Sequence, residues 1–212
     1  MHPALALGVA YVAGSFPSAY LAGRLLKGVD LRTVGSGNLG ATNVYRNLGA
    51  KAAVVVLLID AAKGALPVAL LPALLPANVL DAPNAALWWG LGFGVAAIAG
   101  HAKPIFLLGR GGGKGVATAA GVFTAIAPYA AAVAIATFVI TAWRTGFVSL
   151  ASIVAAAVLP VAVAVTAGLR SPLFLVSLAV ASFVLWSHRA NIGRLRRGTE
   201  PRTFNRRARE TA

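Results

Sequence analysis

Long apolar segments separated by short polar ones dominate the chain. Uncharged stretches occupy most of its length: residues 3–23, 64–80, 82–100, 115–143, 145–169 and 171–187. Several reach or exceed the ~20 residues that an α-helix needs to cross the hydrocarbon core of a bilayer. Membrane-spanning strands would alternate apolar and polar residues, whereas these stretches are apolar on every face. The pattern predicts an all-α polytopic membrane protein.

The distribution of charge predicts how the helices cross the membrane. The polar segments at 24–51 and 110–114 are basic, whereas residues 77–85 carry only Asp81. Basic loops concentrate on the cytoplasmic side, so the N-terminus should lie outside. The segment 188–212 carries eight arginines and should be cytoplasmic. Both ends fit only if 115–143 forms two short helices that meet near Pro128, because proline ends or kinks a helix. The prediction is a bundle of seven spans.

Composition agrees with a membrane protein and excludes several other classes. Of 212 residues, 58% are hydrophobic and 11% are charged, whereas soluble domains carry about 25% charged residues. We expect a single domain over residues 1–212 with a basic tail at 188–212. The net charge of +14 is better explained by anionic lipid headgroups than by nucleic acid. Cysteine is absent, and the histidines and acids are too scattered for a metal site.

The polar segment 34–49, VGSGNLGATNVYRNLG, has the composition of an anion site. It offers backbone amides, hydroxyls, side-chain amides and one guanidinium, which together can hold a phosphate. Its candidate contacts are Ser36, Gly37, Asn38, Thr42, Asn43 and Arg46. The alternative is a flexible loop between two helices.

A second glycine-rich loop, GRGGGKG at 109–115, adds weight to the anion site. It resembles the loop that binds phosphate in ATPases, but only three residues separate Gly109 from Gly113, and Gly115 follows the lysine instead of Ser or Thr. The spacing argues against an ATPase. Backbone amides at the start of a helix still favour an anion. The candidate contacts are Gly111, Gly112, Gly113, Lys114 and Gly115, and a flexible loop is again the alternative.

Two ionisable residues fall inside the predicted second span. Asp60 and Lys63 are three positions apart and therefore share one face of a helix. Charges within a span are expensive, so the pair is either mutually neutralised and structural or supports a nearby site. His101, followed by Lys103 and Pro104, fits the end of a helix that leads into the glycine loop.

Three more residues are candidates for the site. His188 is the better candidate for acid–base chemistry, because imidazole titrates near neutral pH and Asn191 follows one helical turn later. Ser149 begins a span, where serine is either a helix N-cap or a donor to a ligand. The chain has neither a His-x₄-Asp pair nor a Gly-x-Ser-x-Gly elbow.

Three segments, at 14–49, 100–121 and 187–201, together resemble the bacterial integral-membrane acyl-phosphate:glycerol-3-phosphate acyltransferases. LIDAAKG at 58–64 and TGFVSLASI at 145–153 also fit. The resemblance implies seven spans in the bacterial inner membrane and an active site at the cytoplasmic face. It implies transfer of an acyl group from acyl-phosphate to the 1-hydroxyl of glycerol 3-phosphate. The products would be lysophosphatidate and inorganic phosphate, the first acylation step of phospholipid synthesis, and no cofactor or metal is expected.

The resemblance also implies roles for individual residues. Ser36 and Arg46 would contact the phosphate or hydroxyl of the substrate, and Lys114 a phosphate. The loop 111–115 would hold the acyl-phosphate headgroup, whereas Ser149, His188 and Asn191 would complete the glycerol-phosphate site. Glu200 would be structural. Gly146 and Ser187 stand where the family carries basic residues, which weakens the local positive field.

Two other classes compete with an acyltransferase. A transporter for a phosphorylated metabolite also needs basic, glycine-lined sites and broken helices, but it should show a site at mid-membrane and an internal repeat. Neither is apparent in the sequence. A purely structural membrane protein would not need the chemistry of the two loops. We expect a monomer that binds membrane lipids, acyl-phosphate and glycerol 3-phosphate.

Overall fold

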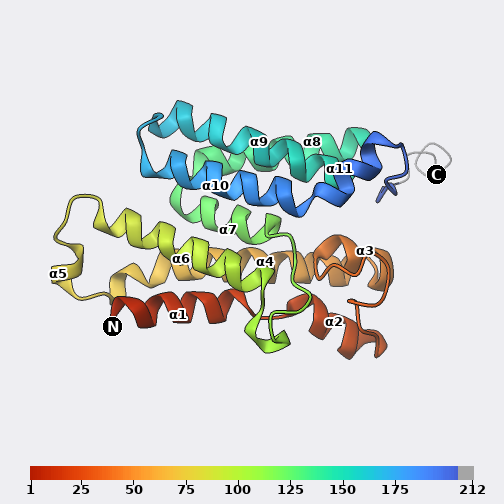
Figure 1. Ribbon diagram of the computed structural model, residues 1–212, viewed down its shortest axis with the longest axis horizontal. Helices are drawn as coiled ribbons and strands as arrows, with labels where there is room; N and C mark the ends of the chain where they lie inside the picture. The colour runs from red at the N-terminus through yellow and green to blue at the C-terminus, as the bar shows by residue number, and fades with distance from the viewer. Residues whose placement is uncertain (205–212) are drawn as a thin grey trace. The chain divides into compact units, whose positions relative to one another are not determined.

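The computed structural model describes residues 1–204, and these contain helices and no strand (Figure 1). The prediction of an all-α protein is confirmed. The chain divides into two compact units, which meet in sequence at Pro128 and Tyr129. The single-domain assignment stays a prediction, and the part of the basic tail at 205–212 lies outside the described residues.

The first unit contains the polar segments from the N-terminal half of the chain. Its helices are α1 (Pro3–Gly14), α2 (Ser18–Lys27), α3 (Ala41–Leu48), α4 (Ala50–Leu70), α5 (Ala77–Leu80), α6 (Ala85–Ala102) and α7 (Val116–Ile126). The first predicted span is broken between α1 and α2, where Pro17 precedes the first residue of α2. Proline cannot donate a backbone hydrogen bond, which explains a break at this position.

Small residues bring two pairs of helices into close contact within this unit. A Cβ atom placed on Gly14 of α1 would lie 2.1 Å from the carbonyl oxygen of Ala97 in α6. A Cβ on Gly121 of α7 would lie 1.9 Å from the carbonyl oxygen of Ala61 in α4. Small residues let helix backbones approach in membrane proteins, where packing replaces the hydrophobic driving force. These contacts fix α6 against α1, as Figure 1 shows, and α7 against α4.

A small apolar core supports the first polar segment. Leu31, Leu39 and Val44 are buried, and they pack with Ala19 of α2 and Val56 of α4. Burial of such side chains stabilises the fold by about 1.5–3 kcal/mol each. The loop between α2 and α3 is therefore anchored by apolar residues on both sides of its polar part.

The second unit is a helical hairpin with additional helices. It contains α8 (Pro128–Thr145), α9 (Val148–Ala167), α10 (Pro172–Ser187) and α11 (Arg189–Arg196). Helices α9 and α10 pack against each other, and the chain bends by 58° between α10 and α11. Helix α7 ends at Ile126 and α8 begins at Pro128, so the predicted break in 115–143 is confirmed.

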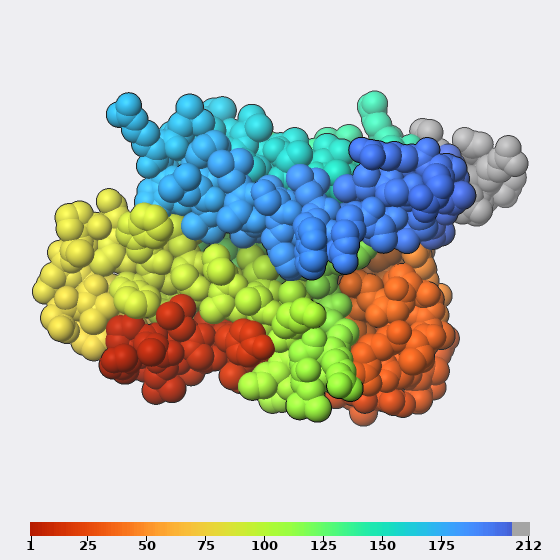
Figure 2. Space-filling view, in the orientation of Figure 1, coloured from red at the N-terminus to blue at the C-terminus, as the bar shows by residue number. Residues whose placement is uncertain are grey.

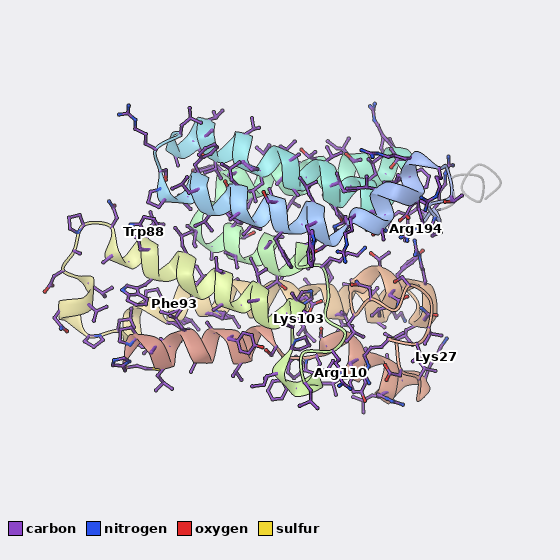
Figure 3. All side chains as sticks on the ribbon, viewed as in Figure 1. Lys27, Trp88, Phe93, Lys103, Arg110 and Arg194 are labelled. Carbon is purple, nitrogen blue, oxygen red and sulfur yellow. The ribbon has the colours of Figure 1, made fainter. Side chains whose placement is uncertain are left out.

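Four helical segments within residues 1–204 are long and apolar enough to cross a membrane: Pro3–Lys27, Ala50–Leu74, Ala85–Leu107 and Val148–Ala167. Counting α10 and α11 as one bent span gives five. These segments support a multi-pass membrane protein, and the count of seven stays a prediction. Helix α6 has Trp88 near one end and Lys103 directly after the other (Figure 3). An aromatic interface and a basic border at opposite ends are typical of a span.

Candidate active site

Asn43 organises the first polar loop. Its side chain is buried, and its Oδ1 accepts hydrogen bonds from the amide of Ser36 at 3.1 Å and from Nδ2 of Asn47 at 3.1 Å. Its Nδ2 donates to the carbonyl oxygens of Leu31 and Val34, each at 3.1 Å. These contacts commit the amide of Asn43 to the loop itself. The residue predicted to bind substrate therefore holds Ser36 in place.

The glycine loop is seated on the end of α6. The amide of Gly113 donates to the carbonyl oxygen of His101 at 3.1 Å. A Cβ on Gly112 would lie 2.0 Å from the carbonyl oxygen of Ala102, and one on Gly113 would lie 2.0 Å from Nε2 of His101. No side chain fits at either position, so these two glycines are required for close packing.

The two polar loops meet within the first unit. A Cβ on Gly111 would lie 2.6 Å from Cδ of Arg32, and one on Gly113 would lie 3.0 Å from the carbonyl oxygen of Leu39. On the face shown in Figure 2, the green loop after α6 lies between the red α1 and the orange α2 and α3. Candidates separated by more than 60 residues in the sequence thus belong to one region of the structure.

The predicted residues of the first unit occupy three neighbouring elements. Ser36, Gly37 and Asn38 lie in the loop between α2 and α3, and Thr42, Asn43 and Arg46 lie on α3. Lys114 immediately precedes Gly115, which is the N-cap of α7. Gly111 to Gly113 complete the loop between α6 and α7. The remaining candidates, Ser149, His188, Asn191 and Glu200, lie in the second unit.

Glu200 gathers the polar residues of the second unit. Its Oε1 accepts from Nδ2 of Asn191 at 2.7 Å, and its Oε2 accepts from Nε of Arg194 at 2.7 Å. Ser149 also lies beside this carboxylate, although its hydroxyl does not meet strict hydrogen-bond geometry with any residue in 1–204. Burial alone would raise the pKa of Glu200, but Ser149, Asn191 and Arg194 together hold it below its usual value. The carboxylate holds helix α11 through Asn191 and Arg194 and lies beside the start of α9.

His188 lies at the bend between α10 and α11. Its side chain is buried, and Nδ1 lies 2.8 Å from the carbonyl oxygen of Val184. A carbonyl oxygen can only accept, so Nδ1 is the donor in this contact. Asn191 is also buried, one turn further along. Their joint role in the site stays a prediction.

Two readings of the segment at 145–149 are changed by the structure. The N-cap of α9 is Phe147, so the interpretation of Ser149 as an N-cap is wrong. Gly146, which stands where the resemblance expects a basic residue, accepts hydrogen bonds from the amides of Thr203 and Phe204 at 2.8 and 3.3 Å. A Cβ at Gly146 would lie 2.5 Å from the carbonyl oxygen of Phe204. This glycine accommodates the segment that follows Glu200.

A buried polar cluster in the first unit was only half predicted. The pair of Asp60 and Lys63 is present, with Nζ 2.7 Å from Oδ1. Sequence reasoning missed that Ser18 and His101 face the same carboxylate. His101 does lie in the last turn of a helix, as predicted, but the residue is only 6% exposed. A histidine within an apolar span was the available signal.

Asp30 and Arg32 form a partly buried ion pair in the first loop. Nη2 of Arg32 lies 2.7 Å from Oδ2 of Asp30, and the guanidinium stacks over the ring of Tyr20 at 5.1 Å. The hydrogen bond from the Arg32 side chain is the main reason that the pKa of Asp30 falls to about 2. This pair fixes the backbone directly before Ser36.

Replacing Asp30 by asparagine should lower the melting temperature by about 1–3 °C at pH 7. A carboxylate whose pKa is depressed on folding stabilises the folded state above its unfolded pKa of 3.8, and this stabilisation is lost as pH falls through about 2. The difference between wild type and variant should therefore disappear near pH 2. Asp81→Asn, the same change at an exposed aspartate, is the control and should show no difference at either pH.

Within residues 1–204, no group of three or more histidines and acids is arranged to hold a metal ion.

Known proteins with similar sequences define the class of protein to which this chain belongs. The family described as "Glycerol-3-phosphate acyltransferase" matches residues 4–198. The chain is 45% identical over 191 residues to the glycerol-3-phosphate acyltransferase of Geotalea daltonii, covering 90% of this chain and 92% of the relative. It is 46% identical over 198 residues to that of Parasynechococcus marenigrum, covering 93% and 88%.

Solved structures of similar proteins agree with this family match. PlsY (YgiH), an integral membrane glycerol 3-phosphate acyltransferase, superimposes in its glycerol 3-phosphate form with a TM-score of 0.85 at 34% identity, covering 97% of this chain and 96% of that one. Its lysophosphatidic acid form gives 0.82 at 33% identity, covering 95% of each chain. Fold and sequence thus define an integral-membrane acyltransferase. The chain belongs to the glycerol-3-phosphate acyltransferase family.

Proposed function

We propose that this protein transfers an acyl group from acyl-phosphate to the 1-hydroxyl of glycerol 3-phosphate, giving lysophosphatidate and inorganic phosphate. Family membership supports the acceptor, since solved relatives are described in glycerol 3-phosphate and lysophosphatidic acid forms. The observation that carries the proposal is the meeting of two loops at Gly111 and Gly113. One loop carries Ser36 and the other leads into Lys114.

A site that holds two phosphates needs positively charged side chains and backbone N–H donors, because the two anions repel each other. Arg46 and Lys114 would offset the repulsion between two anionic substrates. The amides of Gly111 to Gly113, with Lys114 next to the N-terminus of α7, would hold the acyl-phosphate headgroup. Ser36, Gly37, Asn38 and Thr42 would surround the acceptor, and Asn43 would position them. Ser149, His188 and Asn191 would complete the glycerol-phosphate site, with Glu200 supporting them.

The chemical step is a direct displacement at the acyl carbon. The 1-hydroxyl oxygen attacks the carbonyl carbon, the bond from that carbon to the bridging phosphate oxygen breaks, and inorganic phosphate leaves with the electron pair. Holding the two substrates in this geometry supplies much of the acceleration. The hydroxyl proton passes to His188 or to an oxygen of the departing phosphate. No covalent acyl-enzyme and no cofactor are needed.

The same proposal includes a topology. Seven spans follow if α1 with α2, α4, α6, α7, α8, α9 and α10 each cross the membrane. Helix α7 has 11 residues, or about 17 Å at 1.5 Å per residue, which is short for a span. A short helix is tolerated where protein surrounds it, and α7 packs tightly on α4. The N-terminus would lie outside and the site at the cytoplasmic face of the bacterial inner membrane, in a monomer.

A donor-exchange assay tests the proposal. Purified protein in detergent is given radiolabelled glycerol 3-phosphate with palmitoyl-phosphate, palmitoyl-coenzyme A or palmitoyl-acyl carrier protein, in the presence of a chelator. We expect labelled lysophosphatidate only with palmitoyl-phosphate, with one phosphate released per acyl group transferred. Product formation from a thioester donor alone would contradict the donor assignment. Uptake of label into liposomes without acylation would instead favour a transporter.

A further inference from the structure

We propose that His101 is a positioning residue for the donor side of the site, held by Asp60 and Lys63 against the glycine loop. It touches no substrate in this proposal. The inference rests on the proposed function for its kinetic consequence, since it assigns the glycine loop to acyl-phosphate. The physical linkage itself is carried by contacts within the first unit.

Asp60 is the centre of the cluster. One carboxylate oxygen, Oδ1, accepts from Oγ of Ser18 at 2.6 Å, lies 2.7 Å from Nζ of Lys63 and lies 3.7 Å from Nδ1 of His101. All four side chains are buried. A buried carboxylate with a cationic partner and a hydroxyl donor is strongly directional, because breaking any contact leaves a charge or polar atom unsatisfied. The imidazole of His101 therefore faces a fixed charge.

The opposite edge of the same imidazole faces the glycine loop. A Cβ on Gly113 would fall 2.0 Å from Nε2 of His101, and the amide of Gly113 donates to the His101 carbonyl oxygen at 3.1 Å. One small cavity is lined by Ser18, Lys63, His101, Gly112 and Gly113, among others. The ring thus occupies the space between Asp60 and the loop, and no larger residue than glycine fits beside it.

Lys63 extends the linkage to the break in the first span. Its Nζ also donates to the carbonyl oxygen of Phe16 at 3.0 Å, in the segment that joins α1 to α2. The backbone amide of Ser18 donates to the same carbonyl at 3.0 Å, so Lys63 is its second donor at the point where α1 has ended. A broken helix, a buried ion pair and the glycine loop are consequently connected through Asp60.

Loss of this linkage should affect the donor side of the site more than the acceptor side. Gly113 immediately precedes Lys114, so a shift of the loop would displace the amides and the ammonium group proposed for the donor phosphate. Small displacements of positioning groups strongly reduce binding and rate. Ser36 and Arg46 are held by separate contacts, through Asn43 and α3. Loss of the imidazole should therefore weaken the donor side and spare the acceptor side.

The test compares wild type with His101→Ala and His101→Gln. For both variants we expect the KM for palmitoyl-phosphate to rise about tenfold or more, with a change below about twofold in the KM for glycerol 3-phosphate. The KM for palmitoyl-phosphate should rise less in His101→Gln than in His101→Ala, because glutamine keeps most of the side-chain volume. Hydrogen–deuterium exchange of the amides at 109–115 should become faster in both variants. Ser177→Ala, another fully buried polar position, whose hydroxyl bonds only within α10, is the control for general loosening.

The two readouts separate this inference from the proposed function. Unchanged exchange at 109–115 would overturn the linkage, and equal changes in both KM values would overturn the selective role. If wild-type protein rejects palmitoyl-phosphate, the proposed donor fails, and the exchange measurement still decides whether His101 holds the loop. If His101→Ala does not yield folded protein, His101→Gln carries both measurements. A similar exchange increase in Ser177→Ala would also count against the proposal.

Discussion

Replacing Lys114 by alanine should lower kcat/KM for acyl transfer by about 10²–10³-fold, because a cation aimed at a phosphate stabilises charge that no neighbour can replace. Arg46→Ala should cause a loss of similar size on the acceptor side. Lys114 precedes the N-cap of α7, and Arg46 lies on the exposed side of α3. Both variants should remain folded, since neither side chain belongs to the buried core. Initial rates with palmitoyl-phosphate and labelled glycerol 3-phosphate provide the measurement.

Arg110→Ala is the matched control for these two variants. Arg110 lies on the same loop as Lys114 and is exposed (Figure 3), so its removal lowers the local positive charge without removing a proposed contact. We expect a change below about threefold, as for a screened surface charge. Near-normal activity in Lys114→Ala would refute its role, and a large loss in Arg110→Ala would reassign the effect to the general field. Size-exclusion profiles verify that each variant is folded.

Sequence patterns predicted the elements better than their contacts. Apolar runs predicted the helices, and the charge balance of the two ends placed a break at Pro128, which the structure confirms. The pair of Asp60 and Lys63 was predictable because residues three apart on a helix are neighbours. Ser18 on α2 and His101 on α6 join that pair because both helices pack against α4. No local pattern encodes such a contact between helices.

Two residues show where chemical composition was insufficient. Asn43 has the atoms of a phosphate ligand, yet its amide is used by Leu31, Val34, Ser36 and Asn47. Those partners include backbone groups whose positions depend on the path of the loop. Ser149 has the residue type of an N-cap, but α9 begins at Val148, two residues earlier than a cap at Ser149 would require. Residue type predicted polarity in both cases, whereas the backbone decided the partner.

The buried cluster at Asp60 should dominate the stability of the first unit. Lys63→Met removes the cation beside Asp60, a residue that is 1% exposed, and it also removes one of the two donors to the carbonyl oxygen of Phe16. Breaking one partner of a buried ion pair costs about 3–5 kcal/mol, because the remaining charge stays buried without compensation. We expect this loss in the free energy of unfolding, measured by reversible denaturation in detergent micelles.

The double variant Asp60→Asn with Lys63→Met separates the charge from the contact. Asparagine keeps a side-chain oxygen for Ser18 and removes the unpaired charge, so most of the lost stability should return. Its donor KM should remain raised, because asparagine no longer presents a carboxylate to the imidazole of His101. An unfolding free energy as low as that of the single variant would show that packing of the lysine stem, rather than the buried carboxylate, is responsible for the loss. Recovery of stability without recovery of the donor KM would show that the charge of Asp60 serves the site as well as the fold.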